Sequence, residues 1–137
     1  MLHLLNVADR EAQIRFLKEQ EEDMLAPADL QEFTGTEMCY RHPLNYNMLY
    51  TDGVKHFAEE ASAYWFLDIV ATEIFPLLAK EPFMALKMIV VNSQADIIAD
   101  DGNDSVVYTR HIDYTDCPLG TWLFYLTDGV LLLRTEY

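Results

Sequence analysis

A hairpin signal near the C-terminus is the feature that most constrains the fold of this chain. The apolar runs Thr121–Leu126 and Val130–Leu133 flank the tripeptide Thr127-Asp128-Gly129. An Asp-Gly pair between two apolar runs favours a two-residue turn, because both turn residues tolerate positive φ. This end of the chain therefore predicts two antiparallel strands joined by a tight turn.

Further strands are predicted upstream of this hairpin. Hydrophobic and polar side chains alternate along Ser105–Tyr114, as in a strand with one buried face. The dense run Asp100–Asp104 indicates a turn just before it. The other candidates are strands at Thr36–His42, Phe83–Val91 and Ala95–Ala99, and a loop or short strand at Tyr46–Thr51. We expect an antiparallel β-meander of four to five strands.

A long central helix is predicted from Val54 to Phe75. Its apolar residues recur at steps of three and four, which places Val54, Phe57, Ala58, Ala61, Tyr64 and Trp65 on one face. Beyond Tyr64 the segment is apolar nearly all round, which is typical of a buried helix. Pro76 should end or kink it.

The N-terminal part is also expected to be helical, with one helix ending near Ala26 and a short one at Pro27–Leu30. The predicted fold class is α+β, with N-terminal helices and one long central helix packed on the meander. At 137 residues we expect a single domain, in which residues 1–29 are an acidic helical extension and residues 30–137 the core.

The composition fits a folded, reduced protein. Hydrophobic residues make up 51% and aromatic residues 12%, whereas a disordered acidic chain would have few of either. No apolar run is long enough to span a membrane, and the N-terminus lacks the basic region of a signal peptide. Two cysteines form no disulfide framework, so we expect free thiols and a location in the cytoplasm of a bacterial host.

Several segments resemble a family of small uncharacterised proteins from bacteria, phages and plasmids, classed as a domain of unknown function. They are Phe33–Glu37, Tyr40–His42, Tyr50–Val54, Ala63–Trp65, Tyr114–Asp116 with Pro118-Leu119, and Leu131–Leu133 with Glu136-Tyr137. The resemblance covers residues 30–137 in order and implies no reaction. Arg134 departs from it, because the tail of such proteins is expected to carry Pro there.

The charge balance narrows the list of partners. The chain has 23 Asp plus Glu against 9 Lys plus Arg, a net charge of −14, which repels nucleic acid and anionic membranes and attracts basic proteins. Its charge density is on the scale of duplex DNA. The leading hypothesis is therefore a nucleic-acid mimic of the anti-CRISPR or anti-restriction type, which inhibits a nucleic-acid-handling protein by occupying its basic groove. The partner-binding acids would be Glu19, Glu21, Glu22, Asp23, Asp29 and Glu32, with Asp100, Asp101 and Asp104 as a second patch.

Two other hypotheses stay open. The first is a non-enzymatic interaction domain of a mobile element, possibly dimeric through an open sheet edge, whose charge serves solubility. The second is a small metal-dependent hydrolase that uses His42, His111 and Asp113, a weak pattern in which two residues share a strand face. We expect no cofactor, no metal and no catalytic residues.

Three single residues have alternative interpretations. Asp68 lies in an apolar helical segment and should pair with a Tyr hydroxyl, Arg41 or Lys87. Cys117 and His111 could form a thiolate–imidazole pair, but no positive neighbour lowers the pKa of this thiol. Cys39, near Arg41 and His42, has a slightly better setting. Incidental thiols are favoured in both places.

Overall fold

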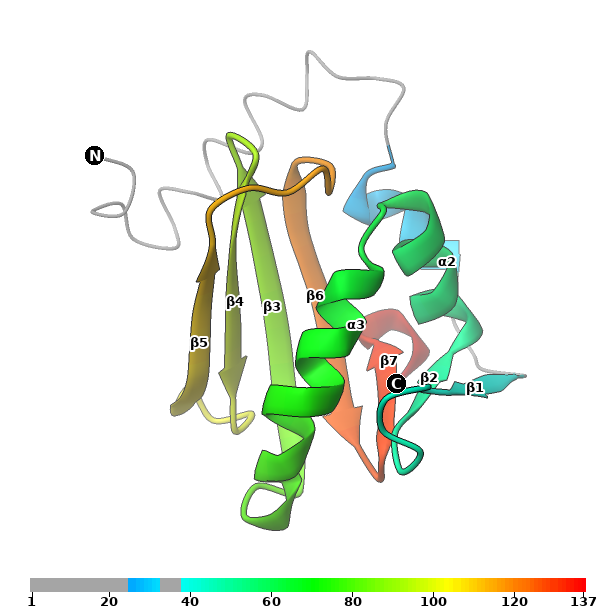
Figure 1. Cartoon of the computed structure of the whole chain (residues 1–137), viewed down its shortest axis with the longest axis vertical. Coiled ribbons are helices and arrows are strands. Elements are labelled where there is room, and N and C mark those ends of the chain that lie inside the picture. Colours follow the sequence, from blue (N-terminus) through cyan, green and yellow to red (C-terminus); the bar gives the residue numbers. More distant parts are fainter. Residues whose placement is uncertain (1–24, 33–37) are drawn as a thin grey trace.

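The computed structural model describes residues 25–32 and 38–137, and it is built on one seven-stranded sheet (Figure 1). The helix predicted to end near Ala26 lies outside these residues. The strands are β1 (Cys39–Arg41), β2 (Leu49–Thr51), β3 (Phe83–Val91), β4 (Gln94–Asp100), β5 (Val106–Ile112), β6 (Gly120–Thr127) and β7 (Val130–Leu133). The mixed α+β class is confirmed, but seven strands replace the four to five that the sequence predicted.

The order of strands corrects the predicted meander. The sheet runs β1-β2-β7-β6-β3-β4-β5, so β6 returns past two strands to pair with β3. Strands β3, β4 and β5 with β6 thus form a Greek key rather than a meander. At the other side β2 pairs with β7 in parallel, with Leu49 opposite Val130. Alternation defines strands but not their neighbours, which is why the pairing escaped prediction.

The predicted hairpin is confirmed. Strand β6 pairs with β7 in antiparallel register, with Thr127 opposite Val130. Asp128 and Gly129 have φ of 53° and 75°, so both turn residues occupy the left-handed region that this kind of turn requires. The run Asp100–Asp104 also forms the predicted turn, between β4 and β5.

The predicted central helix is broken into two. Helix α2 (Asp52–Glu60) ends at Ala61, and Ser62 adopts a left-handed φ of 53° that reverses the chain. Helix α3 (Tyr64–Ile69) then starts in a new direction and continues through a π-helical turn (Val70–Ile74) and a 3₁₀ turn (Phe75–Ala79). No glycine or proline marks the break, so periodicity alone predicted one helix. No described helix is long and apolar enough to cross a membrane.

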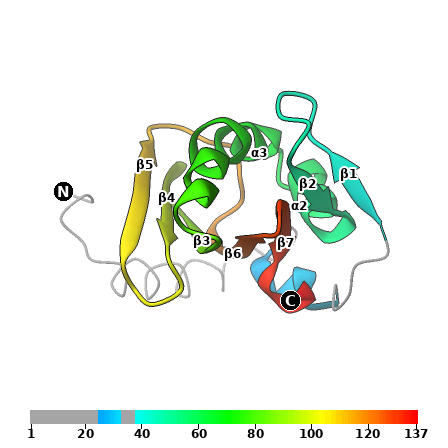
Figure 2. The same cartoon turned by 90° about the horizontal axis from the view of Figure 1, so that it is seen from below.

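Both helices cover one face of the sheet (Figure 2). Phe57 of α2 lies at the centre of the core, with its ring centroid 4.9 Å from that of Trp122 and 5.1 Å from that of Phe124. The core residues contributed by α3 and the π turn are Phe66, Leu67, Val70, Ala71 and Ile74. The predicted burial of this segment is confirmed except on one exposed stripe, Asp68, Thr72 and Glu73.

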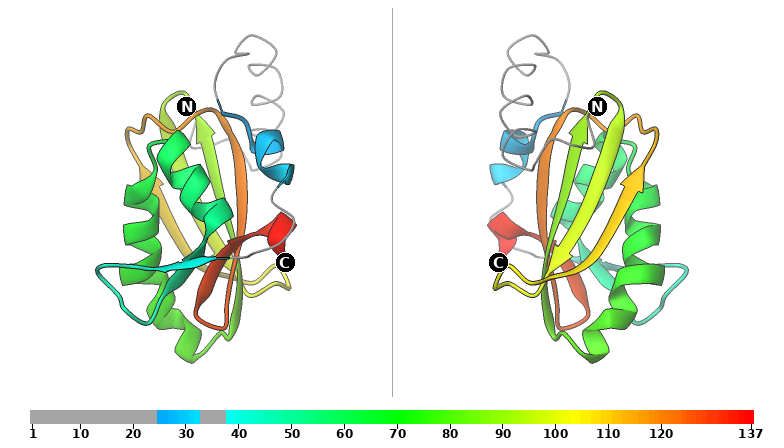
Figure 3. Two further views of the ribbon diagram at one scale, coloured as in Figure 1. Left: turned by 90° about the vertical axis from the view of Figure 1, so that its right-hand side faces the viewer. Right: turned by 90° about the vertical axis from the view of Figure 1, so that its left-hand side faces the viewer.

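A short 3₁₀ helix, η2 (Pro27–Glu32), confirms the predicted helix at Pro27–Leu30 and lies beside the start of β6 (Figure 3). Within β6, only Phe124–Thr127 pair with β7, so η2 takes the place of a neighbouring strand along the first half of β6. Gly120 permits this approach, since a Cβ there would lie 2.8 Å from the ring of Pro27. After β7 the chain forms a last 3₁₀ turn, η5 (Arg134–Glu136), which contacts η2.

Candidate functional site

Acidic side chains gather at one end of the sheet, which we call the acidic end. It comprises Glu81, Asp100, Asp101, Asp104 and Asp128, from the connections before β3, between β4 and β5, and between β6 and β7. The register places these connections together, because Ala85 lies opposite Asp100 and Phe83 lies opposite Thr127. Lys80 is the single Lys or Arg in them.

The turn between β4 and β5 holds its carboxylates in defined positions. Asp100 Oδ1 accepts the backbone N–H of Gly102 at 2.7 Å, and Asp101 Oδ1 accepts those of Asn103 and Ser105 at 2.8 and 3.2 Å. Asp104 is exposed, and its φ of 68° turns the chain into β5. The carboxylates of Asp100 and Asp101 therefore stabilise the turn by accepting backbone N–H groups, and they keep their negative charge at the surface.

The loop between β1 and β2 lies next to the acidic end. The N–H of Leu49 donates to the carbonyl of Gly129 at 2.9 Å, and a Cβ on Gly129 would lie 3.3 Å from the carbonyl oxygen of Asn47. At the tip of this loop Leu44 is 66% exposed and Tyr46 is 70% exposed. Two large apolar side chains thus stand in solvent beside the carboxylates.

This β1–β2 loop is held in one conformation. Asn45 bridges it to α3 through a bond from Nδ2 to the carbonyl of Ala71, 2.9 Å, and also accepts the N–H of Asn47. The guanidinium of Arg41 donates to the carbonyl of Tyr46, and the N–H of His42 donates to the carbonyl of Met48. The exposure of Leu44 and Tyr46 is therefore built into the fold.

His42 is the inner anchor of the same loop. It is 2% exposed, and its Nδ1 accepts the N–H of Leu44 at 3.0 Å, which places the ring proton on Nε2. Nε2 donates to Asp68 Oδ1 at 2.9 Å. The expected partners of Asp68 were therefore wrong, because His42 fills that role and the carboxylate side chain is 53% exposed.

The three residues of the hydrolase hypothesis do not converge. His42 follows β1 and lies on the helix side, whereas His111 belongs to β5 at the opposite edge of the sheet. His111 Nδ1 bonds to Asp96 at 2.9 Å, and its Nε2 lies 3.4 Å from Asp113. Among residues 25–32 and 38–137, no group of three His, Cys, Asp or Glu could hold a metal ion.

Asp29, one of the N-terminal acids of the mimicry hypothesis, is not at the acidic end. Asp29 is exposed on η2, beside the start of β6 and thus toward the other end of the sheet; its Oδ2 accepts the N–H of Ala26 at 2.8 Å. Glu32 is the last residue of η2. Glu19, Glu21, Glu22 and Asp23 lie outside the described residues. Glu81 and Asp128 were not predicted as partner-binding acids, although each lies two residues from a predicted strand.

A buried carboxylate joins the C-terminus to the start of α2. Thr51 Oγ1 donates to Glu136 Oε1 at 2.7 Å, the N–H of Leu133 donates to the same oxygen at 2.9 Å, and Thr51 also caps α2 by accepting the N–H of Val54. Gly53 lies against this carboxylate. The Tyr50–Val54 and Glu136-Tyr137 segments of the family resemblance are thus parts of one structural contact.

Neither thiol has an activating environment. Burial raises the pKa of Cys117 to about 12, and His111 points away from the helix-covered face of the sheet. The pKa of Cys39 is also raised, first by partial burial and then by the carboxylates of Asp52 and Glu136. Of the two thiols Cys39 is the exposed one, which fits the slightly better setting expected for it, but burial and the nearby acids raise its pKa, and Arg41 and His42 do not lower it.

A labelling experiment checks the two thiols. With an alkylating reagent at mildly alkaline pH, Cys39 should react more slowly than free cysteine and Cys117 should not react, since the thiolate is the nucleophile and both pKa values are raised. Mass spectrometry should find one label on the native protein, two on the unfolded protein, and none on native Cys39→Ser. Rapid labelling of Cys117 in the native protein would show that this side chain is not buried.

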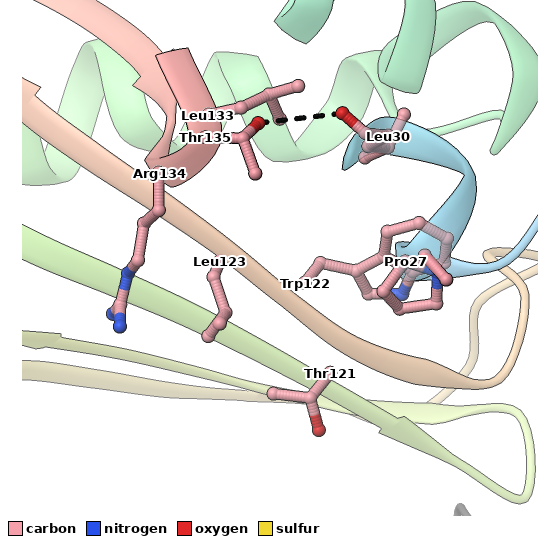
Figure 4. Close-up of a pocket in the computed structure, with 9 residues that line it drawn as sticks. Pro27, Leu30, Thr121, Trp122, Leu123, Leu133, Arg134 and Thr135 are labelled. Carbon is pink, nitrogen blue, oxygen red and sulfur yellow. Dashed lines mark hydrogen bonds between the residues drawn. The ribbon is translucent and has the colours of Figure 1, made fainter. Parts of the chain in front are cut away.

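A small apolar hollow lies between η2, β6 and the C-terminal turn (Figure 4). Its volume is about 180 Å³, below the range of ordinary ligand pockets. Arg134 lines it, but its guanidinium already donates to the carbonyls of Phe124 and Leu86 at 3.3 Å. The bond from Thr135 to the carbonyl of Leu30, 3.5 Å, closes one side. We interpret the hollow as a packing groove under η2.

Comparison with known proteins agrees with the family resemblance. A model described as "Family of unknown function (DUF6876)" matches residues 24–137, so residues 1–23 lie outside the matched range. No curated protein and no solved structure matches the chain.

Proposed function

Since the chain belongs to DUF6876, a family of unknown function, we propose its role from the arrangement of its own charges. It is an acidic binding protein that occupies the basic groove of a nucleic-acid-handling protein and so inhibits it. Phage proteins of the anti-CRISPR and anti-restriction types act in this way. The acidic end is the contact that we assign to the partner, together with the N-terminal acids Glu19, Glu21, Glu22 and Asp23.

The density of charge at the acidic end carries the proposal. Its five carboxylates are spread over the connections of five neighbouring strands, a width of about 14 to 19 Å at the usual strand spacing. One strand of nucleic acid carries a charge every 3.4 Å or so, which gives about four to six charges over that width. The acidic end therefore presents the charge of a single nucleic-acid strand to a basic groove.

The fixed positions of two carboxylates also support a binding role for the acidic end. The bonds from backbone N–H groups hold the carboxylates of Asp100 and Asp101 before any partner arrives, so little side-chain freedom is lost on binding. Little of this charge is cancelled locally, because Lys80 is the single Lys or Arg in the connections that carry the five acids. Long-range attraction speeds the encounter with a basic partner.

Charge alone does not hold a complex together, and the β1–β2 loop supplies an apolar anchor. Tightly bound interfaces usually centre on a few buried aromatic or aliphatic side chains. Tyr46 and Leu44 stand beside the acidic end on a loop that is already rigid. Carboxylates would steer the partner, and these two side chains would be buried in the contact.

Neutralising the acidic end should weaken binding selectively. The variant Asp101→Asn/Asp104→Asn/Asp128→Asn keeps the oxygen acceptors and the tolerance of positive φ, and removes three charges. Affinity for the partner should fall about tenfold, because each exposed charge contributes a modest part of the binding free energy and three charges are removed together. The measurement is capture from nuclease-treated lysate at low and high salt, followed by titration of each purified salt-sensitive protein.

The matched control removes three charges from the opposite end: Glu60→Gln/Asp113→Asn/Asp116→Asn, all exposed residues. The proposal requires a partner that binds nucleic acid, that keeps its affinity for the control, and that releases its nucleic acid when this protein is added. Equal affinity of the two variants, or simultaneous binding of protein and nucleic acid, would overturn it.

A further inference from the structure

Three aromatic rings lie together on the face of the sheet opposite α2 and α3. Phe83 and Tyr125 point to this face, because their neighbours Met84 and Leu126 pack in the core that the helices cover. Their ring centroids are 5.0 Å apart. Tyr137, which follows η5, has its ring centroid 5.8 Å from that of Phe83 and 5.0 Å from that of Tyr125. We call these three rings the aromatic cluster.

The aromatic cluster adjoins the acidic end. Phe83 packs against the turn between β4 and β5, where a Cβ on Gly102 would lie 3.1 Å from the Phe83 ring. Gly102 directly follows Asp101 in this turn. On its other side Phe83 lies opposite Thr127, the residue before Asp128. The β1–β2 loop borders the same end on the helix side, through its bond to α3. The acidic end therefore has apolar side chains on both faces of the sheet.

Tyr137 is the exposed member of the aromatic cluster, with 74% of its surface in solvent. The electron-rich face of a tyrosine ring attracts cations. Two other tyrosines of this protein already hold one, since Lys55 lies 4.5 Å from the ring centroid of Tyr40 and Arg134 lies 5.1 Å from that of Tyr125. Among residues 25–32 and 38–137, no cation lies over Tyr137. Its ring is therefore open to a cation from another molecule.

We propose that the ring of Tyr137 binds the guanidinium group of an arginine side chain of the partner. The inference rests on the proposed function, since a basic groove would bring such cations to the acidic end. The carboxylates raise the local concentration of cations, and the ring offers one of them a face on which to stack. Arginine fits better than lysine, because its guanidinium is planar and more weakly hydrated than an ammonium group. Arg134 makes the same kind of contact with Tyr125, inside the aromatic cluster.

This contact would give the acidic end a selectivity for arginine that long-range charge does not supply. At a distance, carboxylates attract lysine and arginine alike, because both carry one positive charge. A cation–π contact at an exposed site adds about two- to fivefold in affinity. The ratio of the affinities for an arginine peptide and a lysine peptide therefore separates the effect of the ring from that of the net charge.

Titration of the full chain with hexaarginine and with hexalysine, followed by calorimetry at low salt, measures this ratio without the partner. The unchanged protein should prefer hexaarginine, and Tyr137→Ala should lower the ratio of the two affinities about two- to fivefold. Tyr137→Leu keeps an apolar side chain against Phe83 without the ring and should lower the ratio equally, whereas Tyr137→Phe should keep it. The matched control is Tyr114→Ala, which removes a 70% exposed tyrosine beside Asp116 and should leave the ratio unchanged.

Two results would overturn the arginine site: a ratio that Tyr137→Ala leaves unchanged, or a ratio that Tyr114→Ala lowers as much. The variant Asp101→Asn/Asp104→Asn/Asp128→Asn should weaken both peptides and keep the ratio. A ratio lost in this variant and kept in Tyr137→Ala would assign the preference to the carboxylates and also overturn the site. Failure of the proposed function looks different, because it is the absence of a partner that distinguishes the acidic-end variant from its control, whatever the peptide ratio.

Discussion

Replacing Gly53 with alanine is expected to lower the free energy of unfolding by about 3 kcal/mol or more. The added Cβ would lie 2.7 Å from Glu136 Oε1 and 2.8 Å from Leu133 Cδ1, which leaves no room for it. Moving Glu136 away would break its buried bonds to Thr51 and Leu133. In an exposed helix the same change would raise the free energy of unfolding by about 0.5 to 1 kcal/mol. The sign of the change in stability therefore shows whether Gly53 packs against Glu136 and Leu133.

Urea denaturation followed by circular dichroism measures this loss. Glu60→Ala, an exposed change in the same helix, is the control and should shift stability by no more than about 0.5 kcal/mol. Combining Gly53→Ala with Glu136→Ala should cost less than the two single losses together, because the clash with the carboxylate disappears. A Gly53→Ala protein as stable as the wild type would show that the C-terminal turn does not pack against α2.

Replacing Phe57 with alanine should cost about 3 to 5 kcal/mol. Its side chain is fully buried and touches three other aromatic rings, those of Phe66, Trp122 and Phe124, so truncation opens a cavity that rigid neighbours cannot fill. Phe57→Leu keeps most of the volume and should lose clearly less. The measurement is again the midpoint of urea unfolding at constant slope.

Tyr64→Ala is the informative control for Phe57→Ala. Helical periodicity places both residues on one face of a single helix, whereas the break at Ser62 leaves Tyr64 42% exposed with its hydroxyl bonded to Glu59. We therefore expect a loss of about 1 kcal/mol or less for Tyr64→Ala. Similar losses at the two positions would favour one continuous helix and contradict the chain reversal.

Strands and turns were predictable because their signals are local. Strands β3 and β7 have the predicted bounds, and Asp128-Gly129 forms the predicted turn, since alternation and left-handed turn residues act within a few positions. The break at Ser62 escaped because serine has no strong preference for a left-handed φ. What favours the reversal is tertiary: it lets Phe57 and Phe66 meet in one aromatic cluster.

The candidate site was predictable only in part. Asp100, Asp101 and Asp104 lie within five consecutive residues, so the sequence alone shows that they are close together. Glu81 and Asp128 join this cluster only because the Greek key places the start of β3 and the end of β6 beside the end of β4. The rigid loop beside them depends on bonds between residues 26 apart, from His42 to Asp68 and from Asn45 to Ala71. No local pattern announces such pairs.

By itself the sequence determined the charge of this protein, its α+β class, most of its strands and its membership of an uncharacterised family. These follow from composition and from periodicities that each segment carries alone. Only the tertiary structure decided which strands are neighbours, where the helix reverses, and that five carboxylates and two exposed apolar side chains share one end of the sheet. Those choices depend on contacts between distant residues, such as Thr51 and Glu136, 85 positions apart, whose loop-closure cost only the packed core offsets.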